Sequence, residues 1–317
     1  MQSLRYICCQ PAQPYYSWQI EVVIQNFIKM GINPNMMDIV CGHPGVVPDE
    51  FRKLQRHYNT VRFFFYPDTR PDGGNNKYPP SIYFNLMKQH VAAHPSLKDD
   101  ALFTHDADIV FTKPVDFSKF LNDDVWYFSD TASYIGYDYI VSKGQYIYDK
   151  MCEIVGIDPL IPKLMRHASG GAQYIVKNST PEFWEKVEQD SMSLYAYFCK
   201  IEPDWKPLKP NDSYPIQKWT AGMWSFLWNA WKFGFETITP PELNFGWVIN
   251  DVSEVWRYPI LHNSGVVVEN PESARLFKKT DYMYKLPYRE NLDIDKTKAS
   301  YFYWTEILET GKKSILL

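Results

Sequence analysis

Residues 101–111 read ALFTHDADIVF, which places an Asp-x-Asp sequence between two apolar runs. The apolar runs predict buried strands, and a short turn between them can direct the carboxylates of Asp106 and Asp108 toward one point. Two acids this close repel each other, and carboxylate oxygens are the ligands that hard divalent cations prefer. The alternative is a solvated turn, in which Asp is common. We predict that Asp106 and Asp108 bind a divalent cation.

The residues before this turn alternate between strand-like and helix-like patterns. Apolar runs at 5–9, 37–41 and 61–66 predict three strands, and helical periodicity follows each of them. This order is typical of parallel sheets with crossover helices, in which ligands bind at the carboxyl ends of the strands. We therefore expect an α/β fold with a mostly parallel, Rossmann-like sheet flanked by helices.

The composition argues against several classes of protein. Lys and Arg number 33 and Asp and Glu number 37, a net charge of −4 that does not favour nucleic acid or a membrane surface. No apolar run reaches the roughly 18 residues of a membrane span, and the opening residues MQSLRYICCQ lack a hydrophobic signal core. We expect a cytoplasmic protein of microbial or viral origin, without a nucleic-acid partner or a membrane span.

An Asp-x-Asp sequence after an apolar strand also resembles the motif of haloacid-dehalogenase-type phosphatases. In that family the first Asp is the nucleophile, and Asp106 would take this role here. The motif normally follows the first strand of that fold, whereas three strand–helix units precede it in this chain. A Mg²⁺-dependent phosphatase is thus one alternative function, and a nucleotide-sugar-binding protein without turnover is another.

The order of the motifs resembles the nucleotide-sugar glycosyltransferases of the GT-A fold. These enzymes carry Asp-x-Asp after a fourth strand, and this chain adds SGGAQ at 169–173 and a late His262. The resemblance implies a single domain over 1–317, with a nucleotide-binding half at 1–112. It implies an acceptor-side half at 113–317, with smaller strands and a wrapping C-terminal tail. His262 would join Asp106 and Asp108 on Mn²⁺ or Mg²⁺.

Three further segments resemble the hydroxyproline arabinosyltransferase and peptidyl-serine galactosyltransferase group. They are GGAQY at 170–174, FW at 183–184 and WTAGMW at 219–224. Gly222 stands where plant relatives carry an acidic residue, so no role is transferred to that position. The group resemblance implies protein glycosylation or glycan biosynthesis.

The resemblance implies transfer of a hexose or pentose from a nucleoside diphosphate sugar, with UDP favoured, to a hydroxyl of a glycan or glycoprotein. Tyr15 and Tyr16 would stack on the base or pack under the first helix, and Gln173 would offer its amide to the sugar or the diphosphate. We expect donor-binding residues at Cys9, Gln10, Pro11, Tyr15, Tyr16, Lys77, Asp106, Gly170 and Gly171.

The stereochemical course decides which residues complete the catalytic set. We expect Asp108 and Gln173 to belong to it. An inverting enzyme also needs a carboxylate base near the acceptor hydroxyl, for which Asp130, Asp190, Asp212 and Asp251 are the candidates. A retaining enzyme can use a leaving-group oxygen instead. The group resemblance favours retention, with Asp130 and Asp190 kept as the catalytic acids to test.

Overall fold

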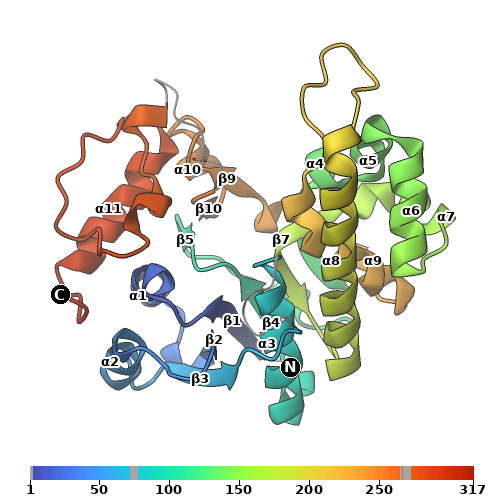
Figure 1. Cartoon of the computed structure of the whole chain (residues 1–317). Helices are drawn as coiled ribbons and strands as arrows, with labels where there is room; N and C mark the ends of the chain where they lie inside the picture. The colour runs from blue at the N-terminus through green and yellow to red at the C-terminus, as the bar shows by residue number, and fades with distance from the viewer. Residues whose placement is uncertain (1–2, 72–77, 265, 267–272) are drawn as a thin grey trace. The chain divides into compact units, whose positions relative to one another are not determined.

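The computed structural model describes residues 3–71, 78–264, 266 and 273–317 (Figure 1). Seven strands form one mixed, mostly parallel sheet in the order β3-β2-β1-β4-β7-β6-β8. β1, β2 and β3 run parallel, β8 is parallel to β6, and β7 is antiparallel to β6. The predicted α/β class with a mostly parallel sheet is confirmed. The strand bounds are β1 Leu4–Pro11, β2 Met37–His43, β3 Arg62–Pro67, β4 Ala101–His105, β6 Trp126–Asp130, β7 Gly170–Val176 and β8 Thr237–Ile238.

The chain folds into two compact units, each built from separate segments of sequence. Unit 1 includes residues 68–103 and 120–241, and unit 2 comprises residues 4–67, 104–119 and 242–317. The predicted boundary between halves at residue 112 stays a prediction.

Unit 2 begins with β1 and the helix that follows it, α1 (Pro14–Lys29). Pro14 suits the first turn of this helix because its fixed φ is helical and its missing N–H would have no partner there. Gly31 follows the end of the helix with a φ of +88°, a conformation that glycine adopts without strain. Helix α11 lies beside α1 (Figure 1). The other helices of this unit are α2 (Asp49–His57), α10 (Glu254–Arg257) and α11 (Ala299–Gly311).

A second, three-stranded sheet also belongs to unit 2. It has the order β5-β10-β9, with bounds Ile109–Phe111, Ile260–His262 and Phe245–Trp247. β10 is antiparallel to β5 and parallel to β9. Behind it lies an aromatic core in which Trp18, Phe277 and Trp304 are buried. The C-terminal segment thereby packs against the first helix of the chain.

Unit 1 is largely helical around the antiparallel pair β6 and β7. Its longest helix begins at an N-cap, Thr180, whose hydroxyl accepts a hydrogen bond from Phe183 N at 3.3 Å. Aromatic side chains fill its core, with Trp126, Trp184 and Phe226 fully buried. The helices are α3 Ser81–Ala93, α4 Ala132–Ile135, α5 Tyr137–Lys143, α6 Gln145–Val155, α7 Leu160–Leu164, α8 Pro181–Ile201 and α9 Ala221–Lys232.

Within the described parts of the chain, none of the helices combines the length and the apolar character required to cross a lipid bilayer.

Candidate metal centre

The Asp-x-Asp sequence forms the tight turn between β4 and β5. After this turn the chain enters β5, whose first residue, Ile109, is paired with His262 in β10. Asn263 N also donates a hydrogen bond to the backbone oxygen of Asp108, at 2.8 Å. The short antiparallel ladder therefore holds the end of β10 against the turn, although the two segments are far apart in the sequence.

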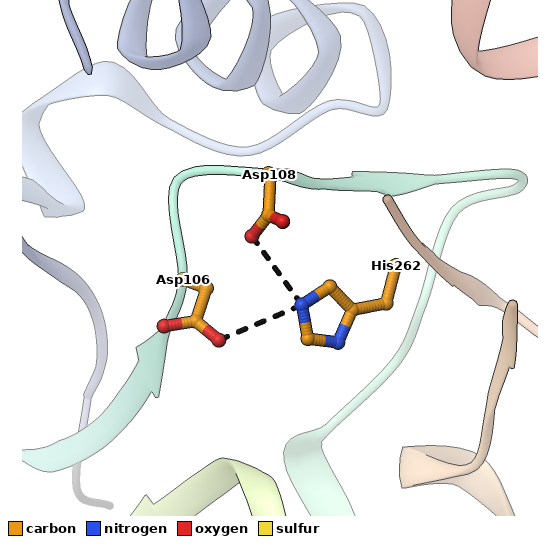
Figure 2. Close-up of side chains that lie close together, drawn as sticks. All are labelled: Asp106, Asp108 and His262. Atoms are coloured by element: carbon orange, nitrogen blue, oxygen red, sulfur yellow. Dashed lines mark ion pairs between the residues drawn. The ribbon is translucent and has the colours of Figure 1, made fainter. Parts of the chain in front are cut away.

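Figure 2 shows the carboxylates of Asp106 and Asp108 directed at the same imidazole nitrogen of His262. His262 Nε2 lies 3.6 Å from Asp106 Oδ2 and 3.3 Å from Asp108 Oδ1. One ligand atom from each residue lies within 4.8 Å of the other two. The side chains of Asp108 and His262 are buried, whereas 46 % of the Asp106 side chain is exposed. The cluster is thus open to solvent on the side of Asp106.

The donor atoms of this cluster fit a divalent cation. Two carboxylates and one imidazole provide oxygen and nitrogen ligands, a set that suits Mn²⁺ and Mg²⁺ among others. The ring of His262 stacks on Trp247, with centroids 5.5 Å apart and an interplanar angle of 16°. Its Nδ1 has no hydrogen-bond partner among the residues that the structure describes. Nε2 is therefore the nitrogen aimed at the carboxylates, and the buried cluster can bind a metal.

A fourth residue, Lys279, contacts the cluster from the C-terminal segment. It opens the 3₁₀ helix η9 (Lys279–Tyr282), and its Nζ donates to Asp108 Oδ2. Sequence reasoning missed this residue, because a single lysine among the charged and aromatic residues of the tail belongs to no motif. The positive charge of Lys279 therefore offsets part of the repulsion between the two carboxylates.

The two carboxylates have opposite pKa shifts. Burial alone would raise the pKa of Asp108, but Lys279 and then His262 outweigh it and hold that pKa well below its usual range. Loss of hydration and then the charge of Asp108 raise the pKa of Asp106. Burial lowers the pKa of His262, but the neighbouring Asp108 outweighs burial and raises it. Asp108 is thus the firmly ionised ligand, and a metal at Nε2 requires that nitrogen of His262 to be unprotonated.

Five of the other predicted donor-binding residues belong to unit 2. Tyr15 and Tyr16 lie in the first turn of α1, half-buried, with their rings edge to face at 4.8 Å. Burial is the largest cause that raises the pKa of both tyrosines, and the charge of Asp108 also raises it. Their hydroxyls therefore lie within electrostatic range of the cluster.

The other predicted donor-binding residues of this unit lie at the end of β1. Gln10 is buried and Pro11 is half-buried there. Cys9 is 1 % exposed, so its thiol is closed to a ligand. Lys77 lies outside the described residues.

Three further predicted catalytic residues, Gln173, Asp130 and Asp190, belong to unit 1. Gln173 is fully buried; its Oε1 accepts from Ser129 Oγ at 2.8 Å, and its Nε2 has no partner among the described residues. Asp130 is exposed and accepts from Ala132 N at 3.0 Å. Asp190 is buried in α8, where Lys186 and Asn229 occupy its two oxygens. Of the two acids, only Asp130 presents its carboxylate to solvent.

Gly170 and Gly171 begin β7 where its pairing with β6 is irregular. The register shifts between Phe128 and Ser129, and Ala172 has a φ of +67°, which is strained for a residue other than glycine. A Cβ at Gly171 would overlap the end of the flexible Met223 side chain, whereas one at Gly170 would lie 2.8 Å from Ser129 O. Close packing within the protein therefore explains the glycine at position 170 without any contact to a ligand.

We expect Gly170→Ala to lower the free energy of unfolding by about 1–3 kcal/mol, because the new methyl group meets backbone that cannot rotate away. Urea unfolding followed by circular dichroism measures the change. Gly246→Ala is the matched control, since a Cβ there meets Glu254 Cβ at an ordinary 3.4 Å. Equal stability of the two variants would contradict the packing argument.

Comparisons with known proteins identify the fold. No protein-family model and no curated protein sequence matches the chain. Among solved structures, the apo structure of WbbM, described as a bifunctional glycosyltransferase, aligns with a TM-score of 0.50 at 8 % identity, over 99 % of this chain and 50 % of that one. The chain thus spans about half the length of that protein. The apo form of mouse xyloside xylosyltransferase 1 aligns with a TM-score of 0.40 at 8 % identity, over 82 % of this chain and 97 % of that one. The first likeness supports the predicted glycosyltransferase-type fold, while the hydroxyproline arabinosyltransferase group stays a prediction.

Proposed function

We propose that this chain is a metal-dependent glycosyltransferase, which moves a sugar from a nucleoside diphosphate sugar to a hydroxyl group of a glycan or glycoprotein. The observation that carries the proposal is the convergence of Asp106, Asp108 and His262 on one point. The cluster follows the carboxyl end of β4, a strand of the mostly parallel sheet. This is the edge of the sheet at which α/β folds bind ligands. The likeness of the fold to a glycosyltransferase supports the same reaction class.

Each residue of the cluster has a defined task in this proposal. A bound divalent cation, Mn²⁺ or Mg²⁺, would neutralise the charge that develops on the departing diphosphate. Asp108, ionised and buried, would hold it from the protein side, and the half-exposed Asp106 would hold it from the side open to the donor. His262 would bind through Nε2 as the neutral imidazole. Burial of two of the three ligands strengthens these interactions, because water screens them less.

The nucleotide would lie beside the start of α1 in this proposal. Tyr15 and Tyr16 are half-buried rather than enclosed, and their rings would contact the base. Gln10 and Pro11 at the end of β1 would add polar and backbone contacts. We propose uridine as the base and UDP as the leaving nucleotide.

We propose that the reaction retains the anomeric configuration. A leaving-group oxygen would then accept the acceptor proton, and no protein carboxylate is needed as a base. Gln173 stays the predicted amide donor to the sugar or the diphosphate, and its buried Nε2 has no partner among the described residues. If the reaction inverts, Asp130 is the better candidate base, because both oxygens of Asp190 have partners.

The test is a screen of UDP-, GDP- and dTDP-sugars with and without Mn²⁺, read by thermal unfolding and by release of free nucleotide. We expect stabilisation by one nucleotide class, and metal-dependent consumption of its sugar. Stabilisation without consumption would indicate a binding protein instead. Orthophosphate release from a generic phosphate ester, with no response to nucleotides, would indicate the phosphatase, which the fold does not favour.

We expect His262→Ala to weaken Mn²⁺ binding roughly tenfold to hundredfold, because the cluster loses its nitrogen ligand. Electron paramagnetic resonance of free Mn²⁺ gives the dissociation constant directly. His57→Ala is the control, since His57 is exposed at the end of α2 in the same unit. An unchanged titration of the His262 variant would make His262 a structural residue.

A further inference from the structure

The chain itself already offsets part of the negative charge at the Asp-x-Asp turn. Lys279 Nζ donates to Asp108 Oδ2, while His262 Nε2 lies 3.3 Å from Oδ1 of the same carboxylate. Both oxygens of the more buried acid of this turn therefore face a nitrogen of the protein. A divalent cation that approaches Asp108 therefore finds the ammonium group of Lys279 already paired with that carboxylate.

The segment that carries Lys279 is held on both sides. Phe277 N donates to Ser300 Oγ at 2.8 Å, and Trp18 Nε1 donates to Tyr282 O at 3.3 Å. The rings of Phe277 and Tyr282 stack on each other with centroids 5.2 Å apart, inside the aromatic core of unit 2. The backbone on either side of Lys279 is thus fixed, and the lysine side chain is the part that can move.

Burial strengthens the ion pair of Lys279. The side chain of Asp108 is only 8 % exposed and that of Lys279 is 27 % exposed, so water screens their attraction weakly. A charge-assisted hydrogen bond of this kind is stronger than a neutral one. A second cation on the same carboxylate would be repelled by the ammonium group unless the lysine moved away.

We propose that Lys279 is an internal counter-cation of this cluster, which competes with the divalent cation for Asp108. In the metal-free protein the ammonium group of Lys279 pairs with the carboxylate of Asp108, and it moves away from that carboxylate when a divalent cation binds. Lys279 therefore lowers the metal affinity of the free protein. This inference rests on the proposed function, because it assumes that the cluster binds a metal at all.

The first test measures Mn²⁺ affinity by electron paramagnetic resonance, which needs no donor or acceptor. We expect Lys279→Met to bind Mn²⁺ about tenfold more tightly than the unaltered protein. Lys278→Met is the matched control: its side chain is 28 % exposed, and its Nζ lies 3.8 Å from Asp281 rather than beside Asp108. This control should bind Mn²⁺ as the unaltered protein does.

The second test uses the unaltered protein, so it does not depend on the folding of a variant. Trace acetylation followed by peptide mass spectrometry reports the reactivity of each lysine. Lys278 and Lys279 have nearly equal exposure, so a change on addition of Mn²⁺ that is confined to Lys279 reports its ion pair with Asp108 rather than solvent access. We expect Mn²⁺ to increase the labelling of Lys279 several-fold and to leave Lys278 unchanged.

The outcomes separate the two proposals. Tighter binding by Lys279→Met, or metal binding that appears only in that variant, supports the competition. Equal or weaker binding by Lys279→Met, or labelling of Lys279 that Mn²⁺ does not change, overturns it while the metal site stands. If neither the unaltered protein nor Lys279→Met binds Mn²⁺, the metal-dependent function itself fails, and the competition fails with it.

Discussion

Asp108→Asn should abolish measurable Mn²⁺ binding and, under the proposed function, lower the turnover of the nucleotide sugar by about 10³-fold or more. Asp108 is the buried, firmly ionised member of the cluster, and its carboxylate faces both His262 and Lys279. An amide has the same shape but no charge, so it binds a divalent cation far more weakly than the carboxylate does. Electron paramagnetic resonance measures the binding, and release of free nucleotide measures the turnover.

Asp116→Asn is the matched control for this substitution. Asp116 belongs to the same unit and is exposed, and its carboxylate accepts from Ser118 N at 2.9 Å. The Asp116→Asn variant should bind Mn²⁺ and turn over the donor as the unaltered protein does. Unchanged Mn²⁺ affinity in Asp108→Asn would refute the metal assignment. Normal turnover without bound metal would refute the metal dependence of the reaction.

Folding must be separated from function in this variant, because Asp108→Asn leaves Lys279 without its counter-charge. An uncompensated, partly buried ammonium destabilises the fold. The double variant Asp108→Asn, Lys279→Met removes both charges and should regain thermal stability relative to the single variant. Metal binding should remain absent in it. A stable double variant that regained metal binding would show that Asp108 is not a required ligand.

The sequence was sufficient for those features whose signals are local. The strand–turn–strand pattern around Asp106 and Asp108 lies within eleven consecutive residues, 101–111, and the structure forms this turn between β4 and β5. The alternation of apolar runs and helical periodicity likewise predicted the parallel strands β1, β2 and β3. In both cases the periodicity that defines the element is present in its own residues.

The sequence was less informative where partners are distant. His262 meets the turn only because β5 and β10 pair, and strands of three residues are too short to show an alternating pattern. Its selection depended on the resemblance to a family. Lys279 had neither a motif nor a periodic pattern, and only the packing of the C-terminal segment brings its ammonium group to Asp108. The roles of Gln173, Asp130 and Asp190 stay predictions.

The C-terminal tail is also fastened to α1 by a buried acid. Glu21 is fully buried, and its Oε2 accepts from Tyr288 Oη at 2.7 Å and from Ser314 Oγ at 2.6 Å. Its Oε1 accepts from Ile315 N at 3.0 Å. One carboxylate thus satisfies three donors from the tail, and it does so on the helix whose first turn carries Tyr15 and Tyr16. Since loss of this one carboxylate would leave all three donors without it, this residue should dominate the attachment of the tail.

Glu21→Ala should lower the free energy of unfolding of unit 2 by about 3–5 kcal/mol, because it leaves buried donors without an acceptor and opens a cavity. Urea unfolding measures the loss, and hydrogen exchange at the amide of Ile315 reports the release of the tail. Glu309→Ala is the control: Glu309 pairs with Lys29, but more than half of its side chain is exposed. A surface pair of this kind contributes less than about 1 kcal/mol. If Glu21→Ala is no less stable than Glu309→Ala, or if the Ile315 amide keeps its protection, then apolar packing rather than Glu21 fastens the tail to α1.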